Sequence, residues 1–594
     1  MSCEGSRVNP SCLFFVPIHA EPVQSVKQPT PAIVAQSAVQ RLPRLALWVL
    51  CLAYALPGFL ARDPWKRADL TTYGYIHELT TAGANWWQPT LAGLAPEIEG
   101  PLPYWLGAWA INALPAGLLP SEVAARLPFI GLLLLTLLAV WYGCYYLARS
   151  PMAQPVAFAF GGEAKPVDYA RALADGGLLA FIACLGLAQL AHETTPALLQ
   201  LCCTSLVFYA AAALPFRWWL PGLAALAGLG GLTLSGAPTM ALLLGLGCAV
   251  IDWFATRGSQ RTRLQTFIKP GLWLLASAVL ALLAREWGLW QWRIELPRAE
   301  WKQWQSLGRL FLWFTWPAWP LALWTLWRWR RQIWSQAPLS RHLWLPIWFY
   351  LVAGAATLST SAADRSLLLG LPALAMLAAL ALPTLSRSVA ALIDWLTLIF
   401  FSGCAIVIWV VWLSMHAGWP AQPARNVAKL APGFLPEFSV LTFLIAVSAS
   451  LTWAWLVFWR TGKHRRPIWK SLVLPAGGAS LCWVLLMTLW LPMLDYARSY
   501  APMVRLGLQQ MAAGPTGCVA TQGLHRSQLA ALRVHGQLDL VPLQTQTECP
   551  WLIADGRLMQ SPATELKGWT LHATLRHPAD RDEKLLLLRR TPPQ

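Results

Sequence analysis

Five charged residues follow directly on an apolar run in the stretch ARDPWKRADL, residues 61–70. They are Arg62, Asp63, Lys66, Arg67 and Asp69. A carboxylate can accept a proton or hold a metal ion, and a Lys or Arg side chain can hold an anion. Charges at the end of an apolar run are costly in a bilayer unless they are solvated or used. The stretch is therefore a candidate functional site.

Two further carboxylates, Glu97 and Glu99, stand in the segment GLAPEIEGPLPYW, residues 93–105. Trp and Tyr favour the boundary between water and lipid, so this segment is expected at the same depth as ARDPWKRADL. The alternative interpretation is that the whole region is an interfacial plug without chemistry.

Membrane helices must position these side chains. The chain has 594 residues, of which 56% are hydrophobic and 12% charged, and it contains 37 Trp. Apolar runs long enough to cross a hydrocarbon core of about 30 Å recur along most of it, which indicates a polytopic membrane protein in a lipid bilayer. The net charge of +18 fits basic cytoplasmic loops. No basic stretch is interleaved with aromatics on a soluble module, which argues against a nucleic-acid partner.

The basic clusters orient the chain when they are all placed in the cytoplasm. About thirteen transmembrane helices then fit, with the N-terminus inside and the C-terminus outside. Residues 1–43 show no cleavable leader and are expected to be a disordered cytoplasmic tail, and residues 44–494 the membrane domain. The expected spans are 45–61, 127–147, 177–191, 196–214, 218–234, 238–256, 270–285, 305–327, 341–359, 366–383, 389–414, 436–459 and 469–493.

The segment from 62 to 126 falls outside, between the first two spans. Leu70, Tyr73, Ile76 and Leu79 recur at helical spacing in ADLTTYGYIHEL, which predicts a helix lying on the membrane surface. The Pro-broken, Trp-rich PLPYWLGAWAINAL, residues 101–114, predicts a second interfacial element.

Several segments match known motifs in order. They are Asp63 after the first span, WWQPTLAGLAPEIEGPLPYWL at 86–106 and EVAARLPFIGLLLLTLLAVWYGCYYLAR at 122–149, with weaker matches in LTLSGAPTMALLLGLG at 232–247 and DRSLLLGLPALAMLAALALP at 364–383. Together they resemble the membrane glycosyltransferases of the class C fold related to lipid A aminoarabinose transferase and protein O-mannosyltransferases. The chain departs from that pattern at Pro64, Gly100 and Ser235, where the family usually has Glu, Lys and Lys.

The resemblance implies transfer of a sugar, with inversion, from a polyprenyl-phosphate donor to an acceptor at the outer membrane face. It makes Asp63 the first candidate for a catalytic base, with Glu99 as its partner or as a ligand of a substrate or of a divalent metal ion. The leaving phosphate gains from nearby positive charge, so basic residues at the outer ends of spans are expected to bind substrate: Arg62, Lys66, Arg67, His192 and Arg365. The other expected substrate-binding residues are Glu97, Tyr104 and Glu193.

Structural interpretations remain open for these residues. Arg62, Lys66 and Arg67 can be anchors whose charged ends reach the interface, and His192 with Glu193 can be a polar turn between two spans. Asp69, one helical turn beyond Lys66, is expected to tolerate loss of its charge.

The composition changes at about 495, and polar and apolar residues alternate in the last hundred. GCVAT, LDLVPL, PWLIAD and EKLLLLRR predict strands and SQLAALRVHG a helix, so residues 495–594 are expected to form a small external α/β domain. Cys518 and Cys549 are its only cysteines, and an oxidising exterior permits a disulfide between them if the strands bring them close.

The expected protein is thus an all-α polytopic membrane protein with an external interfacial loop and a periplasmic α/β domain, in a bacterial inner membrane. Its expected acceptor is an envelope lipid, glycan or protein. The alternatives are a transporter or flippase, for which no convincing internal repeat is visible, and a catalytically inactive scaffold, which the three departures leave open.

Overall fold

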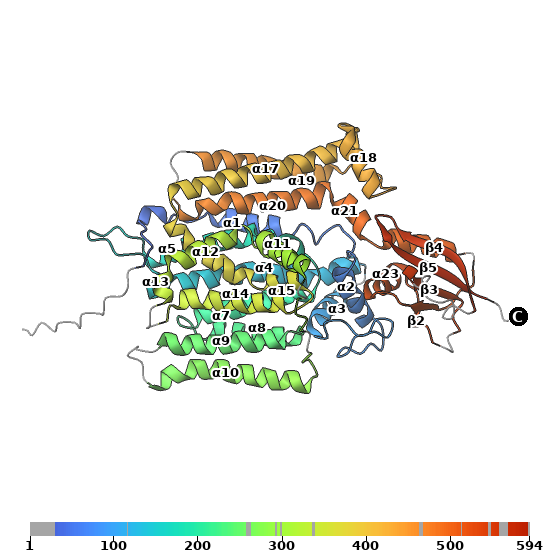
Figure 1. The fold of residues 1–594 in the computed structure, drawn as a ribbon, viewed down its shortest axis with the longest axis horizontal. Coiled ribbons are helices and arrows are strands. Elements are labelled where there is room, and N and C mark those ends of the chain that lie inside the picture. Colours follow the sequence, from blue (N-terminus) through green and yellow to red (C-terminus); the bar gives the residue numbers. More distant parts are fainter. Residues whose placement is uncertain are drawn as a thin grey trace, which may run out of the picture.

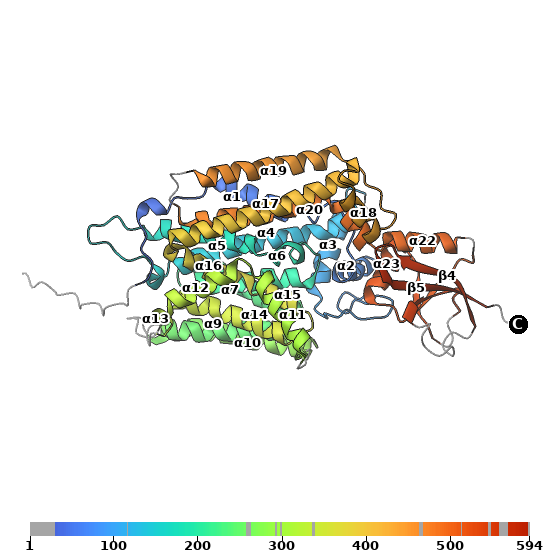
Figure 2. The same ribbon diagram turned by 45° about the horizontal axis from the view of Figure 1, so that its top comes forward.

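The computed structural model describes residues 30–594 except 116, 257–262, 292–293, 298–299, 335–338, 463–466, 513, 545–547, 558–567 and 592–594. Long, roughly parallel helices form a body, and a small sheet domain lies at one end of it (Figures 1 and 2). The helices of the body are α1 (Arg44–Ala55), α4 (Ser121–Ala148), α5 (Pro166–Ala183), α6 (Leu187–Leu190), α7 (Pro196–Ala213), α8 (Trp219–Leu234), α9 (Pro238–Thr256), α10 (Arg263–Glu286), α11 (Trp301–Phe314), α12 (Ala318–Arg328), α13 (Arg330–Ile333), α14 (Arg341–Leu358), α15 (Ala363–Leu368), α16 (Leu371–Ala381), α17 (Arg387–Ala417), α18 (Ala421–Leu430), α19 (Val440–Thr461) and α20 (Val473–Leu489).

Seven of the described helices are long and apolar enough to cross a membrane: α4, α7, α9, α10, α17, α19, and α20 with the turn before it. Of the apolar stretch in α7, 89% is buried in the protein, against 11% in α19, so α7 is central and α19 peripheral. The chain is a multi-pass membrane protein, as predicted, whereas the count of thirteen spans stays a prediction.

Several spans begin or end elsewhere than expected. Helix α1 stops at Ala55, and residues 56–67 form an irregular connection instead of the last turns of a span. The expected span 305–327 is divided into α11 and α12, with Pro317, which has no N–H to donate, between them. The expected span 366–383 is likewise divided, into α15 and α16 around Gly370.

Part of the expected disordered tail packs on the body. Ala32 and Val34 are buried, and their carbonyls accept hydrogen bonds from Val156 and Ala164. Arg41 pairs with Asp168 at 3.1 Å. Residues 30–43 are therefore ordered, which differs from the expectation, and residues 1–29 lie outside the described residues.

The segment 62–126, which is expected to lie outside, contains α2 (Ala68–Leu79) and α3 (Leu102–Ala113) at the end of the body that carries the sheet domain (Figure 1). The predicted helix 68–79 is confirmed, but its apolar face is covered by protein. Leu70, Tyr73, Ile76 and Leu79 are all at most 3% exposed.

The C-terminal domain contains α21 (Leu491–Arg498), α22 (Ala501–Met511), β1 (Val519–Gln522), α23 (Arg526–Gly536), β2 (Leu540–Pro542), β3 (Trp551–Asp555), β4 (Trp569–His577) and β5 (Asp580–Arg590). The sheet order is β2-β1-β3-β5-β4, parallel from β2 to β3 and antiparallel thereafter. The predicted strands and helix are confirmed, and β4 was not predicted.

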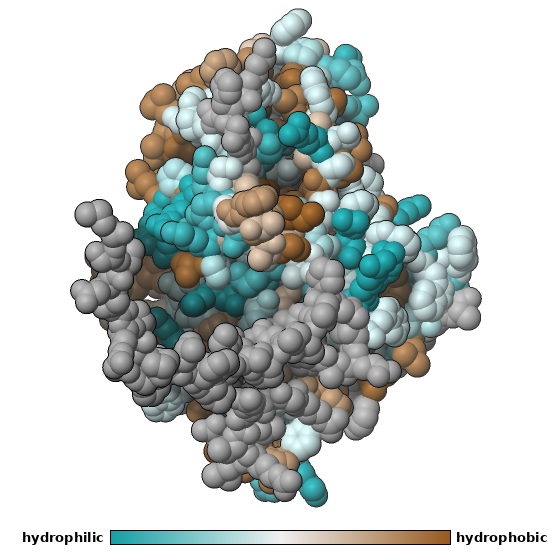
Figure 3. Space-filling model, turned by 90° about the vertical axis from the view of Figure 1, so that its left-hand side faces the viewer, coloured by the Kyte–Doolittle hydropathy of each residue, from teal (hydrophilic) through white to brown (hydrophobic). Residues whose placement is uncertain are grey.

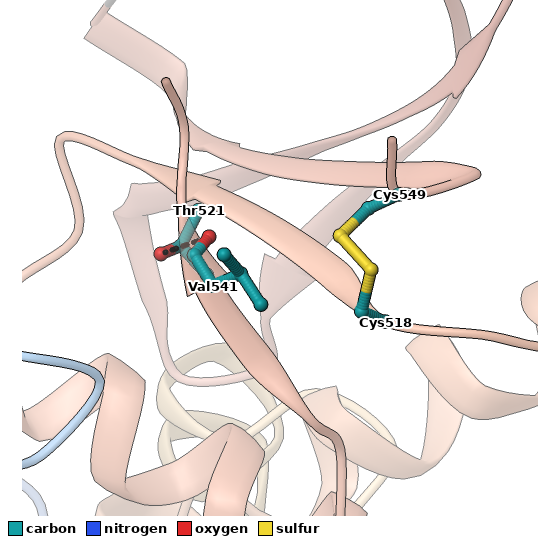
Figure 4. Close-up of a disulfide and its surroundings, with 4 residues drawn as sticks. All are labelled: Cys518, Thr521, Val541 and Cys549. Carbon is teal, nitrogen blue, oxygen red and sulfur yellow. Dashed lines mark hydrogen bonds between the residues drawn. A yellow bond between two sulfur atoms is a disulfide. The ribbon is translucent and has the colours of Figure 1, made fainter. Parts of the chain in front are cut away.

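A disulfide joins Cys518, just before β1, to Cys549, just before β3 (Figure 4). Parallel pairing of β1 with β3 brings the two residues together, and their Cα atoms are 5.0 Å apart. Peptide mapping without reduction is expected to find this pair linked in protein purified from the membrane. Reduction is expected to lower the stability of the domain by about 2–4 kcal/mol, as is usual for a loop of this length. Two free thiols would contradict the structure here.

The opposite end of the body is where α1 begins and where the basic α13 lies. Its described part shows hydrophilic side chains around a smaller apolar patch, and apolar side chains also lie along the flanks (Figure 3). A reporter that works only outside the cytoplasm is therefore expected to be active when fused after Asp495 and inactive when fused after Arg466. The reverse pattern would overturn the predicted topology.

Candidate functional site

The connection between α1 and α2 is held by a buried ion pair. Arg62 Nη1 lies 2.6 Å from Asp69 Oδ2, with both side chains at most 2% exposed. The guanidinium also donates to the carbonyls of Gly58 and His192. Arg126, at the start of α4, donates to the carbonyls of Phe59 and Arg62. Each nitrogen of the Arg62 guanidinium thus donates a hydrogen bond to the protein.

Asp69 is the centre of this network. Besides Arg62 it accepts hydrogen bonds from the backbone N–H groups of Trp65, at 3.1 Å, and Thr194, at 2.7 Å. Burial raises the pKa of Asp69, but the charges of Arg62 and Arg126 and these hydrogen bonds more than offset it and the net shift is downward. Loss of this charge is therefore expected to be costly, which differs from the expectation from sequence that Asp69 tolerates it.

His192 and Glu193 lie in the turn between α6 and α7. His192 is 1% exposed, stacks near Trp483 with ring centroids 4.5 Å apart, and has Nε2 2.8 Å from the carbonyl oxygen of Tyr54. Glu193 is 7% exposed and pairs with Arg365 at 3.2 Å. His192 fits the polar-turn interpretation, whereas Glu193 orients Arg365, whose side chain is partly exposed.

Asp63 is held at two points by the segment after the last long helix. Its N–H donates to Asp495 Oδ1 at 3.0 Å, and its Oδ2 accepts from Ser499 Oγ at 2.7 Å. Asp495 also accepts from Trp65 Nε1. Burial, and then the charge of Asp63, raises the pKa of Asp495 to about 6. Two carboxyl groups therefore share this corner of the site.

Lys66 faces the C-terminal domain. Its Nζ lies 2.9 Å from Asp580 Oδ2 and 3.6 Å from Glu583 Oε2, both on the β4–β5 hairpin. The hydrogen bond from Lys66 lowers the pKa of Asp580. Arg67, the next residue, is exposed and has a backbone φ of +76°, a strained conformation for a residue with a Cβ that is often found at binding sites.

A cavity of about 690 Å³ lies between the C-terminal domain and the end of the body next to it. Its size is ordinary for a small-molecule site, but its lining is largely polar and charged. The charged residues that line it are Lys66, Arg67, Glu97, Asp364, Arg365, Arg526, Asp555, Arg557, Asp580, Asp582, Glu583 and Lys584.

Five of the predicted site residues line this cavity: Lys66, Arg67, Glu97, Tyr104 and Arg365. Glu97 is bridged to the C-terminal domain by Arg526 at 3.5 Å, and the Tyr104 hydroxyl donates to the carbonyl of Ile98. The other five are not among its lining residues: Arg62, Asp63, Glu99, His192 and Glu193. Asp63 stands three residues before Lys66, on the side of Asp495, and Glu99 is exposed.

Two of the departures from the family pattern touch each other. A Cβ on Gly100 would lie 2.2 Å from the backbone nitrogen of Gly236 and 2.3 Å from the carbonyl carbon of Ser235. A side chain at 100 would therefore push the 234–236 turn away. The resembled family usually has Lys at both of these positions, whereas in this chain Gly100 makes a close contact with the backbone of Ser235 and Gly236.

Among the described residues there is no group of three or more His, Cys, Asp or Glu side chains that could hold a metal ion. The divalent metal ion stays a sequence-based prediction, and no step below depends on it.

Several residues of the site were missed from sequence, chiefly Asp495, Ser499, Asp580 and Glu583. Asp495 was noticed only as a change in composition, and Ser499 carries no local signal. Their relation to the outer loop spans more than 400 residues of chain, so only the fold brings them together.

No family model matches the chain, and no curated protein matches it. Two solved structures of ArnT from Cupriavidus metallidurans are similar in fold. The apo form is 15% identical with a TM-score of 0.58, and the form bound to undecaprenyl phosphate is 15% identical with a TM-score of 0.57. Each alignment covers 93% of this chain and 99% of the other. The chain therefore has the fold of ArnT over nearly its whole length, which confirms the fold that the motifs implied.

Proposed function

We propose that this protein transfers a glycosyl group from a polyprenyl-phosphate donor to an envelope acceptor at the outer face of a bacterial inner membrane. The observation that carries the proposal is the charged cavity beside Lys66, Arg67 and Arg365. It lies at the outer end of a fold shared with ArnT, which has been solved with undecaprenyl phosphate bound.

The three cations suit the leaving group of this reaction. A phosphate departs without a general acid but is stabilised by fixed positive charge. Arg365 is 28% exposed in its side chain and is oriented by Glu193, so its remaining N–H groups are available for a phosphate oxygen. Arg67 makes no ion pair among the described residues, and Lys66 is shared with two carboxylates of the hairpin.

Asp63 is the proposed base for an acceptor hydroxyl. Its Oδ2 is held by Ser499, and Oδ1 accepts no hydrogen bond from the described residues, which leaves one oxygen for a substrate. Glu99 and Glu97 are proposed to contact substrate, with Glu97 at the cavity wall. Tyr104 would shape that wall, and Arg62, His192 and Glu193 would hold the loop.

Comparison of envelope lipids and glycans from cells with and without the gene, by mass spectrometry, tests the function. A sugar that is lost with the gene would name product and acceptor together. Unchanged envelope components would argue for the transporter or scaffold alternatives.

Binding of a labelled polyprenyl phosphate to purified protein tests the donor site directly. Arg365→Ala is expected to weaken binding about thirty-fold, the effect of losing roughly 2 kcal/mol of charge-assisted hydrogen bonding. The matched control is Arg505→Ala, an exposed arginine of α22 that does not line the cavity. Equal binding by both variants would remove Arg365 from the site.

A further inference from the structure

The last turn of α21 and the bend into α22, residues 495–500 and here called the elbow, contact residues 63–66 of the connection between α1 and α2. Asp495 accepts the Asp63 N–H, Ser499 donates to the Asp63 carboxylate, and the carbonyl of Arg498 accepts the Lys66 N–H at 2.8 Å. These three contacts fix the backbone of residues 63–66 and the direction of the Asp63 carboxylate.

The direction of the Ser499 hydroxyl is determined by its neighbours. Its oxygen accepts the N–H of Ala501 at 3.0 Å, because a backbone N–H can only donate. Its single proton is then free to point at Asp63 Oδ2, 2.7 Å away. Ser499 is 2% exposed, so water does not compete for this hydrogen bond, and bonds from a hydroxyl to a carboxylate are among the stronger ones.

The C-terminal domain supports the elbow from the other side. His577, at the end of β4, has Nε2 3.2 Å from the carbonyl oxygen of Ser499 and donates to it. The Tyr500 hydroxyl donates a hydrogen bond to Glu583 of β5. Glu583 also accepts a hydrogen bond from Gln528 Nε2 of α23, at 3.2 Å. The elbow thus lies between residues 63–66 and the sheet and makes hydrogen bonds to both.

We propose that Ser499 is a positioning residue for the reaction: its hydroxyl holds one oxygen of the Asp63 carboxylate so that the other faces the acceptor hydroxyl. The proposal rests on the proposed function and on Asp63 as its base. It also gives the C-terminal domain a role in catalysis, through the hydrogen bond of His577 to the elbow.

The test is the pH dependence of kcat/KM for purified full-length protein with a polyprenyl-phosphate-linked sugar and its acceptor. Removing a hydrogen bond that favours the ionised carboxylate makes its protonation easier, so Ser499→Ala is expected to move the acid limb of the profile to higher pH. It is also expected to lower kcat about ten-fold while KM for the donor stays within two-fold. Ser499→Thr keeps the hydroxyl and is expected to restore the wild-type limb.

Other titratable groups interact electrostatically with Asp63: Asp495 of α21, Glu122 of α4 and His535 of α23. They are unchanged in the variant, so only the difference between the profiles of Ser499→Ala and the wild type is read. Ser386→Ala is the matched control. Ser386 caps α17 through Val389 and does not touch Asp63, so its loss removes a cap and is expected to leave the limb in place.

Ser499→Cys, close in size with a weaker donor, covers the case in which Ser499→Ala does not fold, and its limb is expected to shift part of the way. An unmoved limb in folded Ser499→Ala, or in folded Ser499→Cys where Ser499→Ala does not fold, overturns the positioning role. If Asp63→Asn abolishes turnover in the same assay, the proposed function stands even where the positioning role of Ser499 fails. If Asp63→Asn retains turnover, the base assignment fails and the positioning role fails with it.

Discussion

Asp63→Asn should reduce turnover on the order of a hundredfold or more, while the protein stays folded and inserted in the membrane. The substitution keeps the size of the side chain, and an Asn oxygen can still accept the hydrogen bond from Ser499 at Oδ2. It removes the negative charge that takes the proton of an acceptor hydroxyl, and general-base contributions are typically about 10²- to 10⁴-fold. The measurement is kcat with a polyprenyl-linked donor, at equal amounts of membrane-inserted protein.

Two comparisons sharpen this result. Asp539→Asn changes an exposed carboxylate of the C-terminal domain outside the cavity lining and should leave turnover within about two-fold. Glu99 is exposed and does not line the cavity. Glu99→Gln therefore tests whether this second predicted carboxylate is catalytic. A loss as large as that of Asp63→Asn would place Glu99 in the chemistry. Near-normal turnover of Asp63→Asn would instead leave the charges of ARDPWKRADL as interfacial anchors.

Helix α2 shows what periodicity predicts and what it leaves open. The spacing of its apolar residues predicted a helix at 68–79, and the structure has one with those bounds. The pattern does not say what covers the apolar face. Gly107 of α3 lies against Ile76, and Gly74 lies against Ala530 of α23, so protein takes the place expected for lipid. The same apolar stripe fits either environment.

The charges of the outer loop were located from sequence, but their roles were not. Charge at the end of an apolar run predicts only that each residue is solvated, paired or used. Arg62 and Asp69 prove to be paired and buried, whereas Lys66 and Arg67 line the cavity. The difference depends on Thr194, Arg126 and Asp580, which meet this loop only in the folded chain.

Asp69→Asn should destabilise the fold by about 3–5 kcal/mol, the usual result of removing one partner from a buried ion pair. Asp69 pairs with the buried Arg62 at 2.6 Å, and burial raises the pKa of Asp69, but the charges of Arg62 and Arg126 together with its hydrogen bonds lower it overall. Without it both guanidinium groups stay buried, and the N–H groups of Trp65 and Thr194 lose a charged acceptor. Thermal unfolding of the purified protein in detergent measures the change, with Asp539→Asn as a control expected within about 0.5 kcal/mol.

The pH dependence separates this electrostatic role from the loss of a hydrogen-bond acceptor at Asp69. Because the folded-state pKa of Asp69 is lowered, its ionised form contributes stability that is fully present above the unfolded value of about 3.9 and is lost as the pH falls through the folded value. The difference in stability between the wild type and Asp69→Asn should therefore be constant near neutral pH and should shrink toward zero in acid. A difference that persists unchanged in acid would show that a hydrogen-bond acceptor, and not charge, is what Asp69 supplies to Arg62.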